Sequence, residues 1–241
     1  MALSRTLPGR GALAALAGLV AVTVSACGSD EPAETLPALQ PTVRPPTLAN
    51  AVPLTDVPLR NSLLDETKLP DGYIALNDPP PGTVTGAGAA TDPAQCAKVL
   101  SPVGEQAPGA VSQAVAQFSG PDFESVDIDA ASYANGAAAQ AFSQVQSLLQ
   151  GCTTFSGKDA DNVAVDFRLG GLEQPQAGDA STAFRVQTSS QGFTLYTAVS
   201  LTMVGSTVVQ IAMSGATEPD PQRLSALTAE QVAKLRAATG S

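Results

Sequence analysis

The sequence predicts an α+β protein, with one domain whose antiparallel sheet of about five strands packs with helices on one face. The first observation is a series of segments in which apolar and polar residues alternate, as they do in half-buried strands. The second is that short turns containing Gly192 and Gly205 join the last three segments, which is typical of an antiparallel meander. The third is that helical patterns precede and follow the strands instead of alternating with each of them.

Each element follows from a local pattern. The predicted elements are, in chain order, a short helix over 59–69, a helix beginning at 93, a strand over 123–133, a helix over 136–150, strands over 163–169, 184–188, 193–203 and 209–213, and a helix over 221–238. In the helix over 136–150 the apolar residues recur every three or four positions, and Gly151 follows as at many helix ends. In the strand over 123–133, Val126 and Ile128 alternate with Asp127 and Asp129.

The sheet face opposite the apolar one is predicted to be polar. Its residues are Gln187, Thr194, Tyr196, Ser200, Thr202 and Gln210. This face is therefore expected to be open to solvent or to a ligand. Glycine pairs such as Gly170-Gly171 are interpreted as turns, because no lysine-serine pair accompanies them as in a phosphate-binding loop.

The N-terminus has the features of a secretory signal peptide, predicted over residues 1–26. Arg5 and Arg10 precede an uncharged apolar stretch over 11–24, which is shorter than the ~20 residues that span a bilayer. A buried N-terminal helix is the alternative. The residues Val24-Ser25-Ala26-Cys27 resemble a bacterial lipobox. That resemblance implies a diacylglyceryl group on Cys27, with cleavage just before it, although plain secretory cleavage would leave a free thiol.

The residues after Cys27 are rich in proline and are interpreted as an extended tether over 27–53, which leaves the domain at 54–241. About 25 residues of polyproline-like chain could reach ~75 Å. Two acyl chains would hold the protein stably at the membrane. The expected location is therefore the extracytoplasmic face of the cell membrane, with a lipid anchor.

The charged residues exclude several functions. The net charge is −10, so nucleic-acid binding is not expected. The chain also has no histidine, and this excludes catalysis by Ser-His-Asp or Cys-His groups and zinc sites with histidine ligands. The densest acidic run is Asp122, Glu124, Asp127 and Asp129. It lacks the spacing of a calcium loop and is interpreted as a solvated strand face, so neither a metal nor a cofactor is predicted. The protein is not expected to be an enzyme, although a carboxylate-dependent hydrolase remains an alternative.

The domain contains two cysteines, Cys96 and Cys152, and an extracytoplasmic location favours a disulfide between them. Such a bond closes a loop of about 57 residues and contributes ~4 kcal/mol in the chain-entropy model. Two free thiols, or a redox site, are the alternatives.

The sequence also resembles a known family. The strand ending in Ala131-Ser132-Tyr133, the helix ending in Cys152 and the segment Leu69-Pro-Asp-Gly-Tyr73 are similar to the PknH-like extracellular sensor domain, which occurs on actinobacterial kinases and in mycobacterial-type lipoproteins. The resemblance covers about 54–238 and implies an antiparallel sheet whose helices form a groove, held by two disulfides. Only the bridge matching Cys96 and Cys152 can exist here, and the family's frequent tryptophan is absent.

These observations predict a membrane-anchored, non-catalytic domain that binds or senses an unidentified small molecule, lipid or glycan of the cell envelope. Tyr73, Tyr133 and Tyr196 are the candidate ligand-facing aromatics, although buried or half-buried packing is the role that their residue type favours. The alternative is a structural or accessory envelope protein that acts through protein contacts. The sequence predicts neither a specific partner protein nor an oligomeric state.

Overall fold

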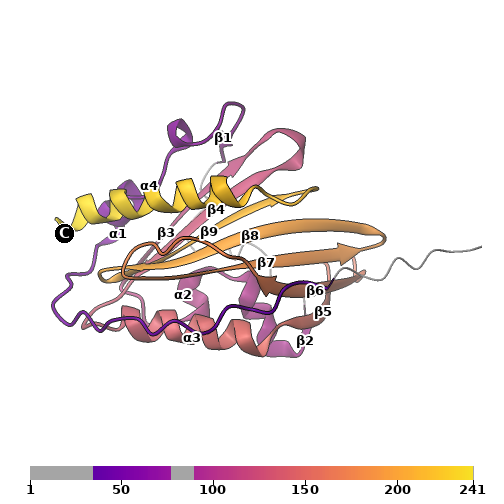
Figure 1. Cartoon of the computed structure of the whole chain (residues 1–241), viewed down its shortest axis with the longest axis horizontal. Coiled ribbons are helices and arrows are strands. Elements are labelled where there is room, and N and C mark those ends of the chain that lie inside the picture. Colours follow the sequence, from indigo (N-terminus) through magenta and orange to yellow (C-terminus); the bar gives the residue numbers. More distant parts are fainter. Residues whose placement is uncertain (1–34, 77–89, 241) are drawn as a thin grey trace, which may run out of the picture. The chain divides into compact units, whose positions relative to one another are not determined.

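The computed structural model describes residues 35–76 and 90–240 and contains one antiparallel sheet with helices on both of its faces (Figure 1). The predicted signal peptide over 1–26 and the candidate lipidation site Cys27 lie outside these residues. The α+β class and the antiparallel arrangement are confirmed.

The sheet has nine strands instead of about five. They are β1 (Ile74–Ala75), β2 (Thr91–Asp92), β3 (Ser112–Ser119), β4 (Ser125–Ser132), β5 (Thr154–Lys158), β6 (Ala164–Gly171), β7 (Ala180–Ser190), β8 (Phe193–Val204) and β9 (Thr207–Gly215). Their order across the sheet is β1-β3-β4-β9-β8-β7-β6-β5-β2. The five predicted strands form the continuous centre β4-β9-β8-β7-β6, and the four additional strands flank it.

The flanking strands were missed because their sequences carry little apolar alternation. In β3, Ala114 and Phe118 are buried, but small and polar residues surround them. β1 and β2 have two residues each, and β5 contains Gly157. Their extended conformation depends on pairing with a neighbouring strand, such as β3 with β4 from Ser112 to Ser119.

The prediction that helices cover one face is wrong, because each face has its own helices. The helices are α1 (Asp56–Asn61), α2 (Val103–Gln106), α3 (Ala138–Gly151) and α4 (Pro221–Thr239). In Figure 1, α1 and α4 lie above the sheet, and α2 and α3 lie below it. On the α3 side, Phe142 packs in one apolar cluster with Phe184 and Leu201. On the α4 side, Leu224 belongs to a second cluster with Ile211.

The strand register explains the second helical layer. Leu201 of β8 lies opposite Gln210 of β9, and Thr202 lies opposite Val209. Cross-strand partners share a face of the sheet, so both faces carry apolar and polar residues together. Each face therefore needs a helix to bury its apolar residues. Gln210 accordingly lies on the α3 side, and not on the predicted polar face.

The two long helices agree with their predicted ranges. α3 and α4 were expected over 136–150 and 221–238. The start of α4 is fixed by the Asp220 carboxylate, which accepts a hydrogen bond from the Gln222 amide at 2.9 Å, and by Pro221 in the first turn. The segment predicted as a helix over 59–69 instead forms α1 and a separate 3-10 turn, Glu66–Lys68. The helix expected from 93 is a 3-10 helix, Ala94–Leu100.

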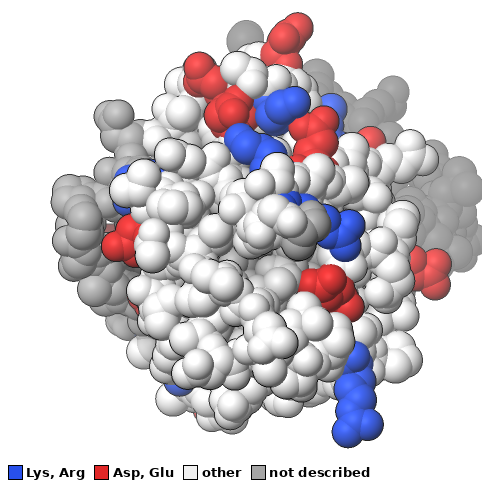
Figure 2. Space-filling view, turned by 90° about the vertical axis from the view of Figure 1, so that its left-hand side faces the viewer, with Lys and Arg blue, Asp and Glu red and all other residues white. Residues whose placement is uncertain are grey.

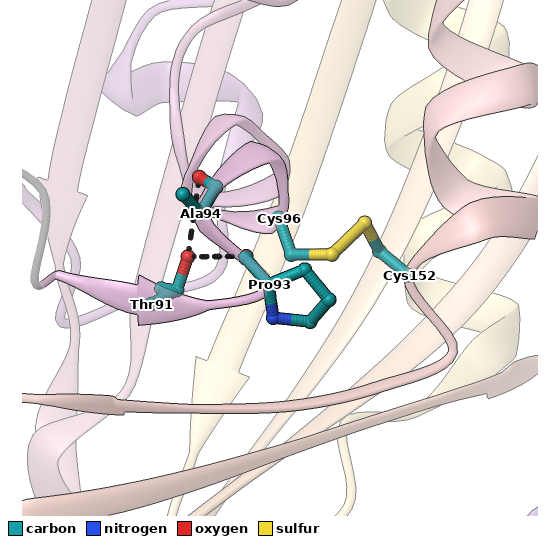
Figure 3. Close-up of a disulfide and its surroundings, with 5 residues drawn as sticks. All are labelled: Thr91, Pro93, Ala94, Cys96 and Cys152. Carbon is teal, nitrogen blue, oxygen red and sulfur yellow. Dashed lines mark hydrogen bonds between the residues drawn. A yellow bond between two sulfur atoms is a disulfide. The ribbon is translucent and has the colours of Figure 1, made fainter.

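The predicted disulfide is present and links the 3-10 helix Ala94–Leu100 to the end of α3 (Figure 3). The Cα atoms of Cys96 and Cys152 are 5.6 Å apart. Close to the bond, the Thr91 hydroxyl donates to the carbonyl oxygens of Pro93 at 2.9 Å and of Ala94 at 3.3 Å. The bridge thus joins the segment around β2 to the helix below the sheet.

The last two-thirds of the predicted tether pack against the domain. Residues 36–53, here named the strap, form an extended chain, and the compact unit begins at Leu36 instead of at residue 54. The Gln146 side chain of α3 accepts from the Val43 amide at 2.7 Å and donates to the Val43 carbonyl at 2.8 Å. The Gly171 amide donates to the Pro37 carbonyl at 2.9 Å. The strap is therefore part of the fold.

Gly170 and Gly171 lie at the end of β6 and do not form the predicted turn. A Cβ atom on Gly171 would collide with the Ala38 carbonyl oxygen, and one on Gly170 would collide with the Leu36 side chain. The two glycines therefore allow the strap to approach the backbone of the sheet closely.

Candidate ligand-binding pocket

A pocket with a volume of about 400 Å³ lies on the α4 side of the sheet. It is bounded by β7, β8, α4, the connection between β6 and β7, and part of the strap. The lining residues are Gln40, Pro41, Val43, Leu172, Glu173, Gln174, Pro175, Gln176, Ala177, Ser181, Thr182, Ala183, Ser200, Thr202, Ser225, Thr228 and Ala229. Small-molecule pockets in proteins commonly measure about 300–1,000 Å³, so this volume suits a ligand.

Two cross-strand pairs form the floor of the pocket. Ser181 of β7 lies opposite Thr202 of β8, and Ala183 lies opposite Ser200. The hydroxyl groups of Ser200 and Thr228 are 2.7 Å apart. The Ser181 hydroxyl accepts from the backbone amide of the pocket residue Ala177 at 2.9 Å. The floor is therefore a layer of side-chain hydroxyls, several of which are fixed by neighbouring groups.

The hydroxyl of Thr202 has no hydrogen-bond partner among the described residues. Thr202 is 1% exposed, and its hydroxyl oxygen has almost no surface open to water, either from the pocket or from outside the protein. An unpaired buried polar group costs about 1–3 kcal/mol, and such groups are uncommon in folded proteins.

The connection between β6 and β7 is held against the sheet and α4. The Gln174 side-chain amide donates to the Pro221 carbonyl at the start of α4, at 2.8 Å. Gly178 has φ +62°, and a Cβ atom there would collide with the Met203 carbonyl oxygen and lie 2.7 Å from the Thr202 methyl group. Glycine at this position lets the connection close over β8.

The chemistry of the lining suits binding. Side-chain hydroxyls and amides predominate, Glu173 is the one carboxylate, and these described residues include neither Lys nor Arg. Activating a serine or threonine as a nucleophile requires an adjacent base or a comparable device. The hydroxyls of Ser200 and Thr228 bond to each other instead, and Thr228 also donates to the Leu224 carbonyl at 2.8 Å.

No family model matches the chain, and no curated protein matches it. Solved structures do match. The extracellular domain of PknH from Mycobacterium tuberculosis aligns with a TM-score of 0.53 and 12% identity, over 78% of this chain and 100% of that domain. The fold is that of the PknH extracellular domain. An uncharacterized protein from Mycobacterium smegmatis, the Rv0999 ortholog, aligns with a TM-score of 0.36 and 14% identity, over 68% of this chain and 84% of that protein.

Within this PknH-like fold, the three candidate tyrosines lie in different places, and none lines the pocket. Tyr133 is 1% exposed and donates to the Ala107 carbonyl at 2.7 Å, and burial raises its pKa to about 12. Tyr73 is buried and donates to the Glu124 carboxylate at 2.7 Å. Burial, followed by this hydrogen bond, raises the pKa of Tyr73 to about 12. Tyr196 is half-buried on β8.

Two other hollows of the PknH-like domain are less suited to a ligand. A cavity of about 190 Å³ is lined by Tyr73, Glu124 and Arg223, among others, and there the Glu124 carboxylate already contacts both Tyr73 and Arg223. A shallower depression of about 720 Å³ is lined by strap residues 47–51, Asp179 and others. There the Asp179 carboxylate accepts from the Gly205 amide at 2.6 Å. Figure 2 shows the left-hand face of Figure 1, on which charges of both signs are mixed and uncharged residues cover most of the surface.

The acidic run is not the solvated strand face that the sequence predicts. The Asp129 carboxylate accepts from the Val103 amide of α2 at 2.6 Å and from the Gln210 side chain at 3.3 Å. Burial raises the pKa of Asp129 to about 7 and also raises the pKa of Asp127. α2 covers this part of β4, which the local sequence does not reveal. In the described ranges, no three Cys, Asp or Glu residues come together as a metal site.

Sequence reasoning found part of the pocket and missed the rest. Ser200 and Thr202 belong to the predicted polar sheet face and do line it. The contribution of α4 was missed, although Ser225, Thr228 and Ala229 are spaced at three and four residues and so place small and polar groups on one side of the helix.

Of the helices in the described ranges, none combines the length and hydropathy needed to cross a membrane.

Proposed function

We propose that this protein is a lipid-anchored, extracytoplasmic and non-catalytic domain that binds a cell-envelope ligand in the pocket between α4 and the β6–β7 connection. The observation that carries the proposal is a formed pocket of about 400 Å³ whose lining is rich in side-chain hydroxyls and amides. A concave, formed site that presents fixed polar groups is the usual location of a small ligand in proteins.

The extracytoplasmic location rests on three observations. The N-terminal sequence has the pattern of a lipoprotein signal ending at Cys27. The disulfide between Cys96 and Cys152 suits an oxidising compartment. The fold is shared with a domain that is extracellular in PknH.

The strap limits the distance between the domain and the membrane. A lipid on Cys27 would be separated from the first docked residue, Leu36, by nine residue steps. At ~3.5 Å per residue, a fully extended chain would span at most about 30 Å. This is less than half of the ~75 Å expected for a tether over 27–53. The proposed function therefore places the pocket close to the envelope surface.

A second candidate function is an accessory role through protein contacts. The observation that favours it is the exposure of Phe123 and Phe193, at 93% and 81%, which lie in the β3–β4 turn and next to the β7–β8 turn. Exposed aromatic residues are enriched in protein interfaces. The formed pocket favours ligand binding, and the experiment below separates the two functions.

The test is native mass spectrometry of the full-length protein extracted gently from its own envelope. Ala229→Trp places a large ring in the mouth of the pocket from an exposed position on α4. Ala226→Trp makes the same change on an exposed position that does not line the pocket. The proposal predicts a bound small molecule on the wild-type protein and Ala226→Trp, and none on Ala229→Trp. Adducts on all three proteins, or on none, would contradict it.

The anchor has a separate test. Cys27→Ala removes the proposed acylation site, so the protein should move from the detergent phase to the aqueous phase in detergent partitioning. Unchanged retention in the detergent phase would exclude lipidation of Cys27.

A further inference from the structure

We propose that the hairpin between β7 and β8 is a second membrane contact, in which the side chains of Phe193 and Leu195 insert among the lipids that hold the acyl anchor. The inference rests on the lipid anchor of the proposed function. It adds which end of the domain faces the membrane, and it does not depend on the pocket.

The hairpin presents apolar side chains without any charge. Phe193 is 81% exposed and Leu195 is 43% exposed, and residues two apart on a strand point to the same face of the sheet. On that face, Val199 and Leu201 continue the row and are buried in the cluster on the α3 side. No charged residue occurs over 186–217. The hairpin can therefore enter lipid without transferring a charge from water.

The strap begins on the same side of the domain. In Figure 1 it runs beside α3, and its N-terminal end lies toward the right-hand side, where the β7–β8 hairpin also projects. Leu36, the first docked residue, meets Gly170 of β6, which lies opposite Arg185 of β7. From there β7 continues to Ser190, next to the hairpin turn. The strap therefore starts on the side toward which the hairpin projects.

The anchor is within reach of the hairpin. Five residues along β7 and two strands across the sheet separate Leu36 from Phe193 by about 20 Å, at ~3.4 Å per residue and ~4.8 Å per strand. The nine residue steps from Cys27 to Leu36 span at most about 30 Å. A lipid on Cys27 and the Phe193 ring can therefore reach the same membrane surface. Because tethering gives a high effective concentration, a contact that is weak on its own suffices.

The exposed Phe123 is not part of this contact. Asp122 and Glu124 flank it in the β3–β4 turn, so its insertion would bring two charges toward the lipid. The register also makes the β7–β8 hairpin the longer projection. Ser125, the first residue of β4, is level with Thr197 of β8, and β8 extends four residues, about 14 Å, beyond that level.

Acidic residues beside the hairpin determine which lipids suit the contact. Asp159 and Asp161 lie in the β5–β6 turn, and β6 is two strands, or about 10 Å, from β8. Lys158, which precedes them, offsets only part of their charge. Anionic headgroups repel such carboxylates. We therefore expect the hairpin to insert into zwitterionic lipid and to gain nothing from anionic lipid.

The experiment uses tryptophan fluorescence. The chain contains no tryptophan, so Phe193→Trp introduces a single indole at the proposed contact. The variant is purified from its own envelope with its anchor and reconstituted into phosphatidylcholine vesicles. Its emission should lie at shorter wavelength than that of the same variant carrying Cys27→Ala in buffer, and acrylamide should quench it at least about threefold less, as for indoles at a membrane interface. Phosphatidylcholine with brominated acyl chains should quench it.

Phe123→Trp is the matched control, because it makes the same substitution at an exposed phenylalanine of the other turn. Its indole should keep the emission and the acrylamide quenching of the protein in buffer. Leu195→Ser, added to Phe193→Trp, should lower quenching by the brominated lipid about twofold, since one of the two inserted side chains is lost. Adding phosphatidylglycerol to the vesicles should leave the quenching by brominated lipid unchanged or lower it.

Three results would overturn the inference. Equal acrylamide quenching of Phe193→Trp on vesicles and in buffer would return Phe193 to the protein partner of the second candidate function. Equal quenching of Phe193→Trp and Phe123→Trp by brominated lipid would show that the contact is not specific to the hairpin. Stronger quenching with phosphatidylglycerol would mean that charge makes the contact.

Failure of the proposed anchor looks different. A protein that does not float with the vesicles carries no acyl anchor, and the inference falls with the anchor. A protein that floats while the indole at position 193 stays in water keeps the anchor and excludes only the hairpin contact. The pocket is tested separately by Ala229→Trp.

Discussion

Asp129 should make the stability of the domain depend on pH. This carboxyl group lies on β4 where α2 packs against that strand, and the Val103 amide of α2 donates a hydrogen bond to it at 2.6 Å. Burial is the largest influence on it and disfavours its charged form, which raises its pKa from 3.8 to about 7. Replacing Asp129 by Asn keeps the size and the acceptor oxygen of the side chain and removes its titration.

The sign and the magnitude follow from the two pKa values. Between about pH 4 and pH 7 the folded protein holds the Asp129 proton, whereas the unfolded chain releases it, so the free energy of unfolding falls as the pH rises. The two values differ by about three pH units, which corresponds to about 4 kcal/mol lost across this range. Below pH 4 the contribution is fully present, and above pH 7 the loss is complete.

Urea unfolding between pH 4.5 and pH 8.5 measures this effect. The Asp129→Asn protein should lack the decline that the wild-type protein shows, and at pH 8 it should be more stable by up to about 4 kcal/mol. Asp166→Asn, at an exposed position of β6, is a control that should leave the decline in place. Parallel pH profiles for Asp129→Asn and the wild-type protein would refute the reasoning.

Three further predictions concern the disulfide, the strap and the β6–β7 connection. Replacing Cys96 and Cys152 together by Ala should lower the free energy of unfolding by about 4 kcal/mol in urea titrations, because the unfolded chain gains entropy; no loss would argue that the bridge is absent in solution. Gln146→Ala should speed proteolytic cleavage within 36–53, since both backbone groups of Val43 lose their partner. Unchanged cleavage would mean that the strap is held elsewhere. Gly178→Ala should cost about 1–3 kcal/mol in thermal unfolding, because a Cβ atom at φ +62° meets the backbone of β8; a neutral effect would show that the connection can move away.

The centre of the fold was predictable because its elements carry strong local patterns. α3 combines Phe142, Val145 and Leu149 on one side, and β4 alternates Val126 and Ile128 with acids. Such periodicity reports which side of an element is buried. It does not report which neighbour buries it. The register that separates the apolar residues of β8 and β9 onto opposite faces was therefore invisible, and so was the second helical layer.

The strap shows a different limit of sequence reasoning. Its prolines indicate an extended chain, and the chain is extended, but extension does not imply a free tether. It is held by main-chain groups such as those of Val43 and Pro37, which bond to Gln146 and Gly171. These partners are about 100 residues or more away in the sequence. A contact made by the backbone leaves little trace in the residue types of the segment that makes it.

The sequence predicted the strand residues of the pocket, but not the connection and the helix that complete it. The polar side chains of Ser200 and Thr202 on a strand indicated a face without apolar packing. The connection over 172–179 and the start of α4 complete the site by tertiary contact, for example from Gln174 to Pro221. The tyrosines were chosen for their chemistry, yet Tyr133 and Tyr73 use their hydroxyls within the protein.

The most direct test of the central claim is a crystal structure of the protein purified from its own envelope without removal of bound molecules. The account predicts electron density for a small molecule between α4 and the β6–β7 connection, within hydrogen-bond distance of polar side chains that line the pocket. A bound molecule located elsewhere on the domain, with only ordered water in the pocket, would contradict it.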